Sequence, residues 1–169
     1  MEKITADVLL KGDIWEEVIS KLQPSIFKTQ YGVYALCVAL GVMYDKQLSF
    51  DGEDNSEQRY VPRTMLYQKK EELEILFQTA ILTTETVSFS EDQRLELAFG
   101  TSKMKDFNEM QFLTRFANYG ATILRDKIAD EPIETMENIK NLITSTVEGT
   151  NFDIDPLSDD DIDISAEDL

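Results

Sequence analysis

The sequence contains no histidine, and Cys37 is the single cysteine among its 169 residues. Without histidine the chain cannot form a Ser-His-Asp triad, and it lacks both a common zinc ligand and the usual general base at neutral pH. One cysteine excludes an internal disulfide and a cysteine-rich metal site. Because Cys37 lies in the apolar stretch VYALCVALG, we expect a buried and unreactive thiol.

Phosphate-binding motifs and long apolar runs are also missing. Neither G-x-x-x-x-G-K-[ST] nor G-x-G-x-x-G occurs, so we expect no catalytic residues, no metal and no cofactor. The longest apolar stretch, residues 31–44, is shorter than the roughly 20 residues that a membrane span requires. The N-terminus does not follow the order of a signal peptide. These features favour a cytoplasmic protein outside the membrane.

Positive charge is scarce, since 16 basic residues stand against 33 acidic ones and give a net charge of −17. Proteins that bind nucleic acid normally carry a basic excess, because neutralisation of phosphates supplies most of their affinity. Direct nucleic-acid binding by the isolated chain is therefore disfavoured. The sequence contains one local basic patch, but neighbouring glutamates reduce its net positive charge. Its members are Arg59, Arg63, Lys69 and Lys70.

Apolar periodicity predicts a mainly α-helical domain over residues 1–148, folded as a compact bundle of about six helices. The helices are expected at residues 13–23, 30–46, 67–84, 90–100, 106–129 and after Pro132. Asp13 and Thr29 are the expected N-caps of the first two, and Ser90 with Gln93 has the form of a capping box. The pattern leaves open one short strand pair, with one of its strands near residues 59–61.

Two helices have informative apolar faces. Residues 30–46 are apolar on nearly every side, which predicts a helix in the centre of the core. The helix after Pro132 is amphipathic, and its expected inward residues are Ile133, Met136, Ile139, Leu142, Ile143 and Val147.

The stretch FANYGATIL places Asn118 and Gly120 inside the helix at residues 106–129, although both are weaker helix formers than alanine. Two interpretations are open. In the favoured one, Gly120 admits a neighbouring helix while Asn118 faces water or bonds locally. In the other, Asn118 specifies a contact at a helix interface.

Residues 149–169 form an acidic tail that holds eight carboxylates and no basic residue. We expect this segment to be flexible alone or ordered by a partner, with aliphatic residues entering apolar grooves while aspartates meet Lys or Arg. The expected partner-binding residues are Leu157, Asp159, Asp160, Asp161, Ile162, Asp163 and Ile164. The competing interpretation is that the acidic tail only keeps the protein soluble.

Two stretches resemble a known family. IFKTQYGVYALCVALGVMYDK resembles the early helix of small bacterial proteins found beside DNA phosphorothioation (Dnd) genes, the family of Dnd system-associated protein 4. The matching residues are Phe27, Thr29, Ala39 and Gly41. LTRFANYGATIL resembles the later family segment F-E-x-Y-A-N-G-G-x-x-x-L. It keeps the pattern at Ala117, Asn118, Gly120 and Leu124, and departs from it at Leu113, Phe116 and Tyr119.

The resemblance covers residues 25–128 and does not extend to the acidic tail. It implies a bacterial genome-defence setting and a small accessory component without its own active site. We therefore expect a non-catalytic accessory subunit of an anti-phage or anti-plasmid complex, in which a larger ATPase, nuclease or both perform the chemistry. The alternative is an acidic DNA-mimic inhibitor, or an autoinhibitory gate that covers the DNA channel of a partner.

Overall fold

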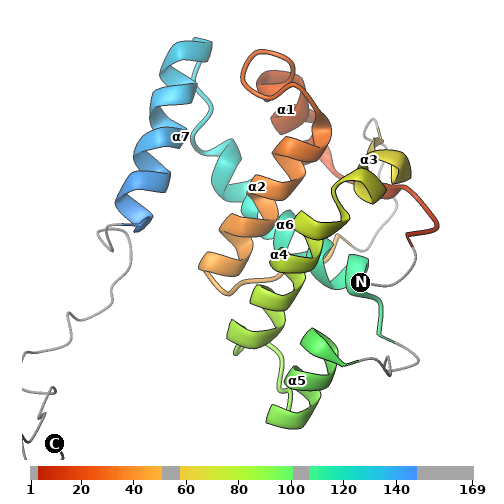
Figure 1. Cartoon of the computed structure of the whole chain (residues 1–169). Helices are drawn as coiled ribbons and strands as arrows, with labels where there is room; N and C mark the ends of the chain where they lie inside the picture. Colours follow the sequence, from red (N-terminus) through yellow and green to blue (C-terminus); the bar gives the residue numbers. More distant parts are fainter. Residues whose placement is uncertain (1–3, 51–57, 101–106, 148–169) are drawn as a thin grey trace, which may run out of the picture.

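The computed structural model describes residues 4–50, 58–100 and 107–147, and it confirms the mainly α-helical fold (Figure 1). These residues contain seven helices and one antiparallel two-stranded sheet. In chain order the elements are β1 (Val8–Leu10), α1 (Asp13–Leu22), α2 (Gln30–Met43), β2 (Arg59–Val61), α3 (Arg63–Gln68), α4 (Lys70–Thr83), α5 (Glu91–Phe99), α6 (Glu109–Arg125) and α7 (Pro132–Val147).

The crossing of α2 and α6 forms the centre of the molecule and is its most extensive helix contact. Two glycines permit it. A Cβ atom at Gly41 would lie 2.0 Å from the carbonyl oxygen of Phe116, and one at Gly120 would lie 1.9 Å from that of Cys37. The two backbones therefore touch at reciprocal positions, and the close approach expected at Gly120 is confirmed.

The predicted central helix is also confirmed, because α2 buries side chains around its circumference, among them Val33, Tyr34 and Val38. Its start is fixed locally, since the Thr29 hydroxyl accepts a hydrogen bond from the Gly32 amide. The capping box of α5 is confirmed as well, with reciprocal bonds between Ser90 and Gln93. Local polar signals thus set two helix starts correctly.

Three predicted boundaries were wrong. The N-cap of α1 is Gly12 at φ 102°, and Asp13 is instead the first helical residue, where its charge suits the positive end of the helix dipole. The helix expected at residues 67–84 is two helices, α3 and α4, separated by a non-helical Lys69. No glycine or proline marks that break. α6 begins after its N-cap Asn108 and ends at Arg125, whereas the predicted helix ran from residue 106 to residue 129. Asp106 itself lies outside the described residues.

The expected short strand pair is present: the strand at residues 59–61 is β2, and its partner is β1, whose position in the chain was not predicted. Val8 pairs with Val61 and Leu10 with Arg59. Val8, Leu10 and Val61 face the core, while Leu9 between them is 41% exposed. A three-residue strand offers too short an alternation for sequence periodicity to separate it from a loop.

Aromatic rings join α4 and the segments flanking α5 to α6. Phe77 and Phe89 each contact both Phe107 and Phe112, and Phe112 packs edge-on against Phe116 at a centroid distance of 5.2 Å. In Figure 1, α5 lies at the lower end of the molecule and α7 at its upper left side. Both helices are peripheral to the α2–α6 crossing.

Candidate protein-binding surfaces

Asn118 is a buried polar residue at the junction of α6, α1 and the segment after α2. Its Oδ1 accepts a hydrogen bond of 2.9 Å from Trp15 Nε1, and its Nδ2 donates one of 3.0 Å to the carbonyl oxygen of Leu48. The favoured interpretation, in which Asn118 faces water or bonds locally, was therefore wrong. In the sequence, Trp15 could have indicated this contact, because a buried indole N–H requires a hydrogen-bond acceptor. Asn118 supports the fold internally and is 7% exposed.

Cys37 lies in the core beside this junction and is fully buried. Burial raises the pKa of its thiol far above the ordinary value, because the charged thiolate is disfavoured there. The expectation of a buried thiol is confirmed. Among residues 4–50, 58–100 and 107–147 there is no group of three or more His, Cys, Asp or Glu that could hold a metal ion.

The inward face predicted for α7 was half wrong. Ile139 and Leu142 are buried as expected, but Ile133, Met136 and Ile143 are 70%, 52% and 41% exposed. Thr135 and Thr146 are buried in their place. Val147 ends the helix, and its side chain lies outside the described part. At about 100° per residue, the buried residues are centred roughly a quarter-turn from the exposed apolar ones.

Hydrogen bonds near the start of α7 set this rotation. The Thr135 hydroxyl accepts from the Ala129 amide at 2.9 Å, and Asn138 Nδ2 donates to the Lys127 carbonyl at 3.3 Å. Near the other end, the Thr146 hydroxyl donates to the Leu142 carbonyl, so its burial leaves no unpaired hydroxyl. The result is an exposed apolar stripe on a peripheral helix, which we call the α7 stripe (Ile133, Met136 and Ile143).

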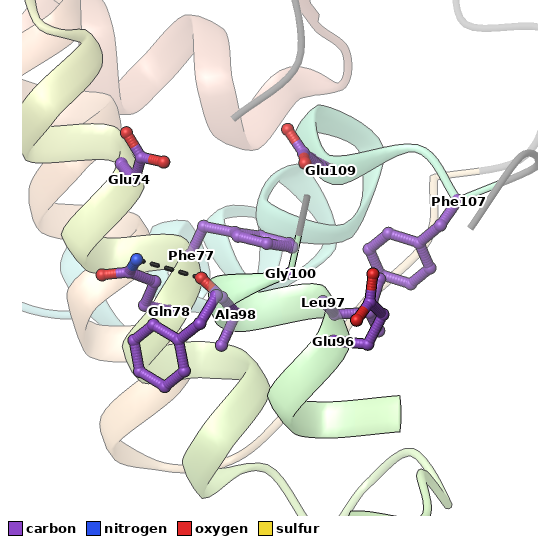
Figure 2. Close-up of a pocket in the computed structure, with 10 residues that line it drawn as sticks. Glu74, Phe77, Gln78, Glu96, Leu97, Ala98, Gly100, Phe107 and Glu109 are labelled. Atoms are coloured by element: carbon purple, nitrogen blue, oxygen red, sulfur yellow. Dashed lines mark hydrogen bonds between the residues drawn. The ribbon is translucent and has the colours of Figure 1, made fainter. Parts of the chain in front are cut away.

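A small cavity of 200 Å³ lies between α4, α5 and the start of α6 (Figure 2). Phe77, Leu97 and Phe107 supply its apolar wall, and Gln78 Nε2 closes one side by donating to the Ala98 carbonyl at 3.0 Å. Three glutamates surround it, Glu74, Glu96 and Glu109, and each already takes part in another interaction. The cavity is smaller than the roughly 300 Å³ typical of small-molecule pockets, so its size suits one inserted side chain.

The basic patch of the sequence is divided in the structure. Lys69 forms an ion pair with Glu72, and the main chain of Arg63 is bound by Asp7 Oδ1 at 2.7 Å. Arg59 instead lines a larger cavity of 540 Å³ together with Lys28, which is remote in sequence. The sequence could not show that Lys28 and Arg59 line one cavity, because Lys28 lies in the loop between α1 and α2 and Arg59 lies in β2.

The other predicted binding residues cannot be placed. Leu157, Asp159, Asp160, Asp161, Ile162, Asp163 and Ile164 all lie outside the described residues. In the described part, no helix combines the length and apolarity needed to cross a membrane.

Comparison of the chain with protein-family models, with curated proteins and with solved structures found no match. The proposed function therefore rests on the surfaces described above and on the chemistry of their residues.

Proposed function

We propose that this chain is a non-catalytic subunit of a larger assembly and that it docks on its partner through the α7 stripe. The observation that carries the proposal is the exposure of Ile133, Met136 and Ile143 along one side of a peripheral helix. A helix with a second apolar stripe, beside the one packed on its own domain, is typical of helix-mediated recognition.

The sequence resemblance supplies the setting of this proposal, a bacterial defence complex in which a larger ATPase or nuclease performs the chemistry. The acidic tail would be a second contact, with Leu157, Ile162 and Ile164 as aliphatic anchors between aspartates. Two weak contacts on one chain reinforce each other, because binding of the first raises the effective concentration of the second.

The test is affinity purification of the tagged chain from its native cells, followed by reconstitution with the purified partner. The test variant is Ile133→Ser/Met136→Ser/Ile143→Ser. We expect about 100-fold weaker binding, since partial burial of three such side chains contributes roughly 1 kcal/mol each. Isothermal titration with the wild-type chain and the variant measures the difference.

A matched control carries the same number of substitutions at exposed apolar residues of helices other than α7. Ile75, Leu95 and Phe99 of α4 and α5 are 64%, 48% and 62% exposed, and their replacement by serine should leave the affinity unchanged. Equal affinity of the α7 variant and the wild type would contradict docking through the stripe. ATP hydrolysis or DNA cleavage by the purified chain alone would contradict the non-catalytic role.

A further inference from the structure

A lysine lies within the α7 stripe. Lys140 is exposed, and along the helix it stands between Met136 and Ile143. At about 100° per residue, the three stripe residues span an arc of about 80° around the helix axis, and Lys140 falls inside this arc. Ile133, Met136, Lys140 and Ile143 therefore follow one another along one side of α7, at spacings of three, four and three residues.

This spacing is typical of the line of contact along which one helix packs on another. Residues at alternating intervals of three and four stay on one side of a helix, and a partner helix covers them in turn. From Ile133 to Ile143 the helix rises about 15 Å, which matches nearly three turns of a partner helix. Lys140 would therefore lie inside such a contact and not at one of its ends.

The charge of Lys140 is not neutralised within the described part of the chain, because Lys140 forms no ion pair with another described residue. Glu137 precedes it by one turn. That carboxylate is exposed and borders the stripe on the side away from the buried Ile139 and Leu142. The ammonium group of Lys140 is therefore available to a binding partner.

Docking of a partner on the stripe would remove water from the Lys140 ammonium group. A charge that is covered by apolar surface without a counter-charge opposes binding, whereas a carboxylate of the partner would replace the lost water and form a charge-assisted hydrogen bond. Alternatively, the flexible lysine stem could carry the charge to water at the edge of the contact. The two arrangements predict opposite effects when Lys140 is replaced by an apolar residue.

The charges along α7 favour a partner carboxylate opposite Lys140 in particular. Glu134 and Glu137 are exposed on the same helix, and the whole chain carries a charge of −17. A partner acid is attracted where it faces Lys140 and repelled where it faces Glu137, about one turn away. Lys140 would thereby fix how the partner helix is aligned, as single charged or polar residues do in other helix pairs.

We propose that the partner element docked on the α7 stripe is an amphipathic helix of another protein, that an Asp or Glu lies within its apolar face, and that this carboxylate pairs with Lys140. The apolar residues of that helix cover Ile133, Met136 and Ile143. The inference rests on the proposed function, because it names the chemistry of the partner at the same stripe.

The first test measures affinity by isothermal titration of the full chain with the partner purified in the α7 experiment. Lys140→Met should weaken binding roughly 10- to 30-fold, because it leaves the partner carboxylate unpaired inside the contact. Lys140→Arg keeps the charge and should stay within about threefold of the wild type. The matched control is Lys21→Met, which removes the same charge from an exposed residue of α1 and should change the affinity by less than about twofold.

The second test identifies the partner group with a carbodiimide, which joins an amine and a carboxylate that are in direct contact. In the complex we expect a cross-link between Lys140 Nζ and an Asp or Glu of the partner, located by mass spectrometry. Lys140→Arg should bind without this cross-link, because a guanidinium group does not react. Lys140→Glu should bind poorly, and a lysine at the cross-linked position of the partner should restore most of the lost affinity.

Equal or tighter binding of Lys140→Met would overturn the inference, because the lysine would then contribute nothing to the contact or oppose it. Cross-linking of Lys140 only to acids of its own chain, or to a second copy of that chain, would also overturn it. In each of these cases, weaker binding of the serine variant of the stripe would leave the proposed function standing. If the serine variant binds as tightly as the wild type, or no partner is recovered, the proposed function and this inference fail together.

Discussion

Trp15 and Asn118 are 103 positions apart in the chain, yet they share a buried hydrogen bond of 2.9 Å from the indole Nε1 to the amide Oδ1. The same amide binds the Leu48 carbonyl through Nδ2. One side chain thus connects α1, α6 and the segment after α2. It does so at the edge of the central crossing, where the fully buried Trp15 N–H would otherwise have no partner.

Replacement of Asn118 by alanine should lower the free energy of unfolding by about 2–4 kcal/mol, because it leaves the Trp15 N–H and the Leu48 carbonyl without a partner. Urea denaturation monitored by circular dichroism measures this change. Asn138→Ala is the matched control, since its bond to the Lys127 carbonyl is 3.3 Å long and only part-buried; we expect less than about 1 kcal/mol there. Equal losses in the two variants would contradict the special role of Asn118.

Gly120→Ala should destabilise the fold by about 2 kcal/mol or more, because the new methyl group would force α2 and α6 apart. The atom it would meet is backbone, the Cys37 carbonyl oxygen at 1.9 Å, so no side-chain rotation can relieve the overlap. Gly32→Ala is the control, since the nearest atom there is Phe27 Cδ1 at 3.1 Å. Thermal unfolding should place this control within about 1 kcal/mol of the wild type.

The two apolar faces of α7 should respond differently to truncation. Ile139→Ala removes a buried side chain and should cost about 2–4 kcal/mol of unfolding free energy. Ile143→Ala, four residues further along, removes one that is 41% exposed and should cost less than about 1 kcal/mol. Chemical denaturation of both variants tests the rotation of the helix directly. A larger loss for Ile143→Ala would contradict it.

Asp45 joins the end of α2 to the end of α4. Its carboxylate accepts hydrogen bonds from the Thr84 hydroxyl and from the amides of Glu85 and Thr86, at 2.6, 2.7 and 3.1 Å. Partial burial raises the pKa of Asp45, but these hydrogen bonds outweigh it, so the pKa lies below its usual value. The folded state therefore binds the proton less tightly than the unfolded state does.

Stability from the Asp45 carboxylate should accordingly be complete above the unfolded-state pKa of about 3.9 and disappear as the pH falls through the lower folded-state pKa. Asp45→Asn should be less stable than the wild type at pH 7, and the gap should shrink below about pH 4. The test is to measure the free energy of unfolding of both proteins from about pH 2.5 to about pH 7, in steps of about half a pH unit, and to plot their difference against pH. Asn tolerates the positive φ of 45° at this position, so the backbone conformation is kept. The substitution removes the charge and also replaces one of the two accepting oxygens with an NH₂ donor. A gap that stays constant with pH would contradict the assignment.

Much of the fold could be predicted because its signals are local. Thr29 and the Ser90–Gln93 pair act within one helical turn, and the apolar surround of α2 is a property of one segment. The break at Lys69 was missed because no residue there disfavours a helix strongly. The position of the partner strand β1 was missed because three residues show no usable alternation.

The candidate site was less predictable, and α7 shows why. Its sequence contains a broad apolar arc, and the periodicity placed Ile133, Met136 and Ile143 together with Ile139 and Leu142. Which part of that arc is buried depends on the contacts of Thr135 and Asn138 with residues 127–129. Those contacts lie outside the helix, so no pattern within it reports them.

Composition, caps and apolar periodicity were enough to predict a helical, histidine-free and strongly acidic chain with a central apolar helix, because these signals act over a few neighbouring residues. Three relationships follow instead from the packing of the helices: Asn118 binds Trp15, α7 exposes an apolar stripe, and Lys28 and Arg59 line one cavity. Each of these relationships joins segments far apart in the chain, and their geometry depends on how the helices pack around the α2–α6 crossing.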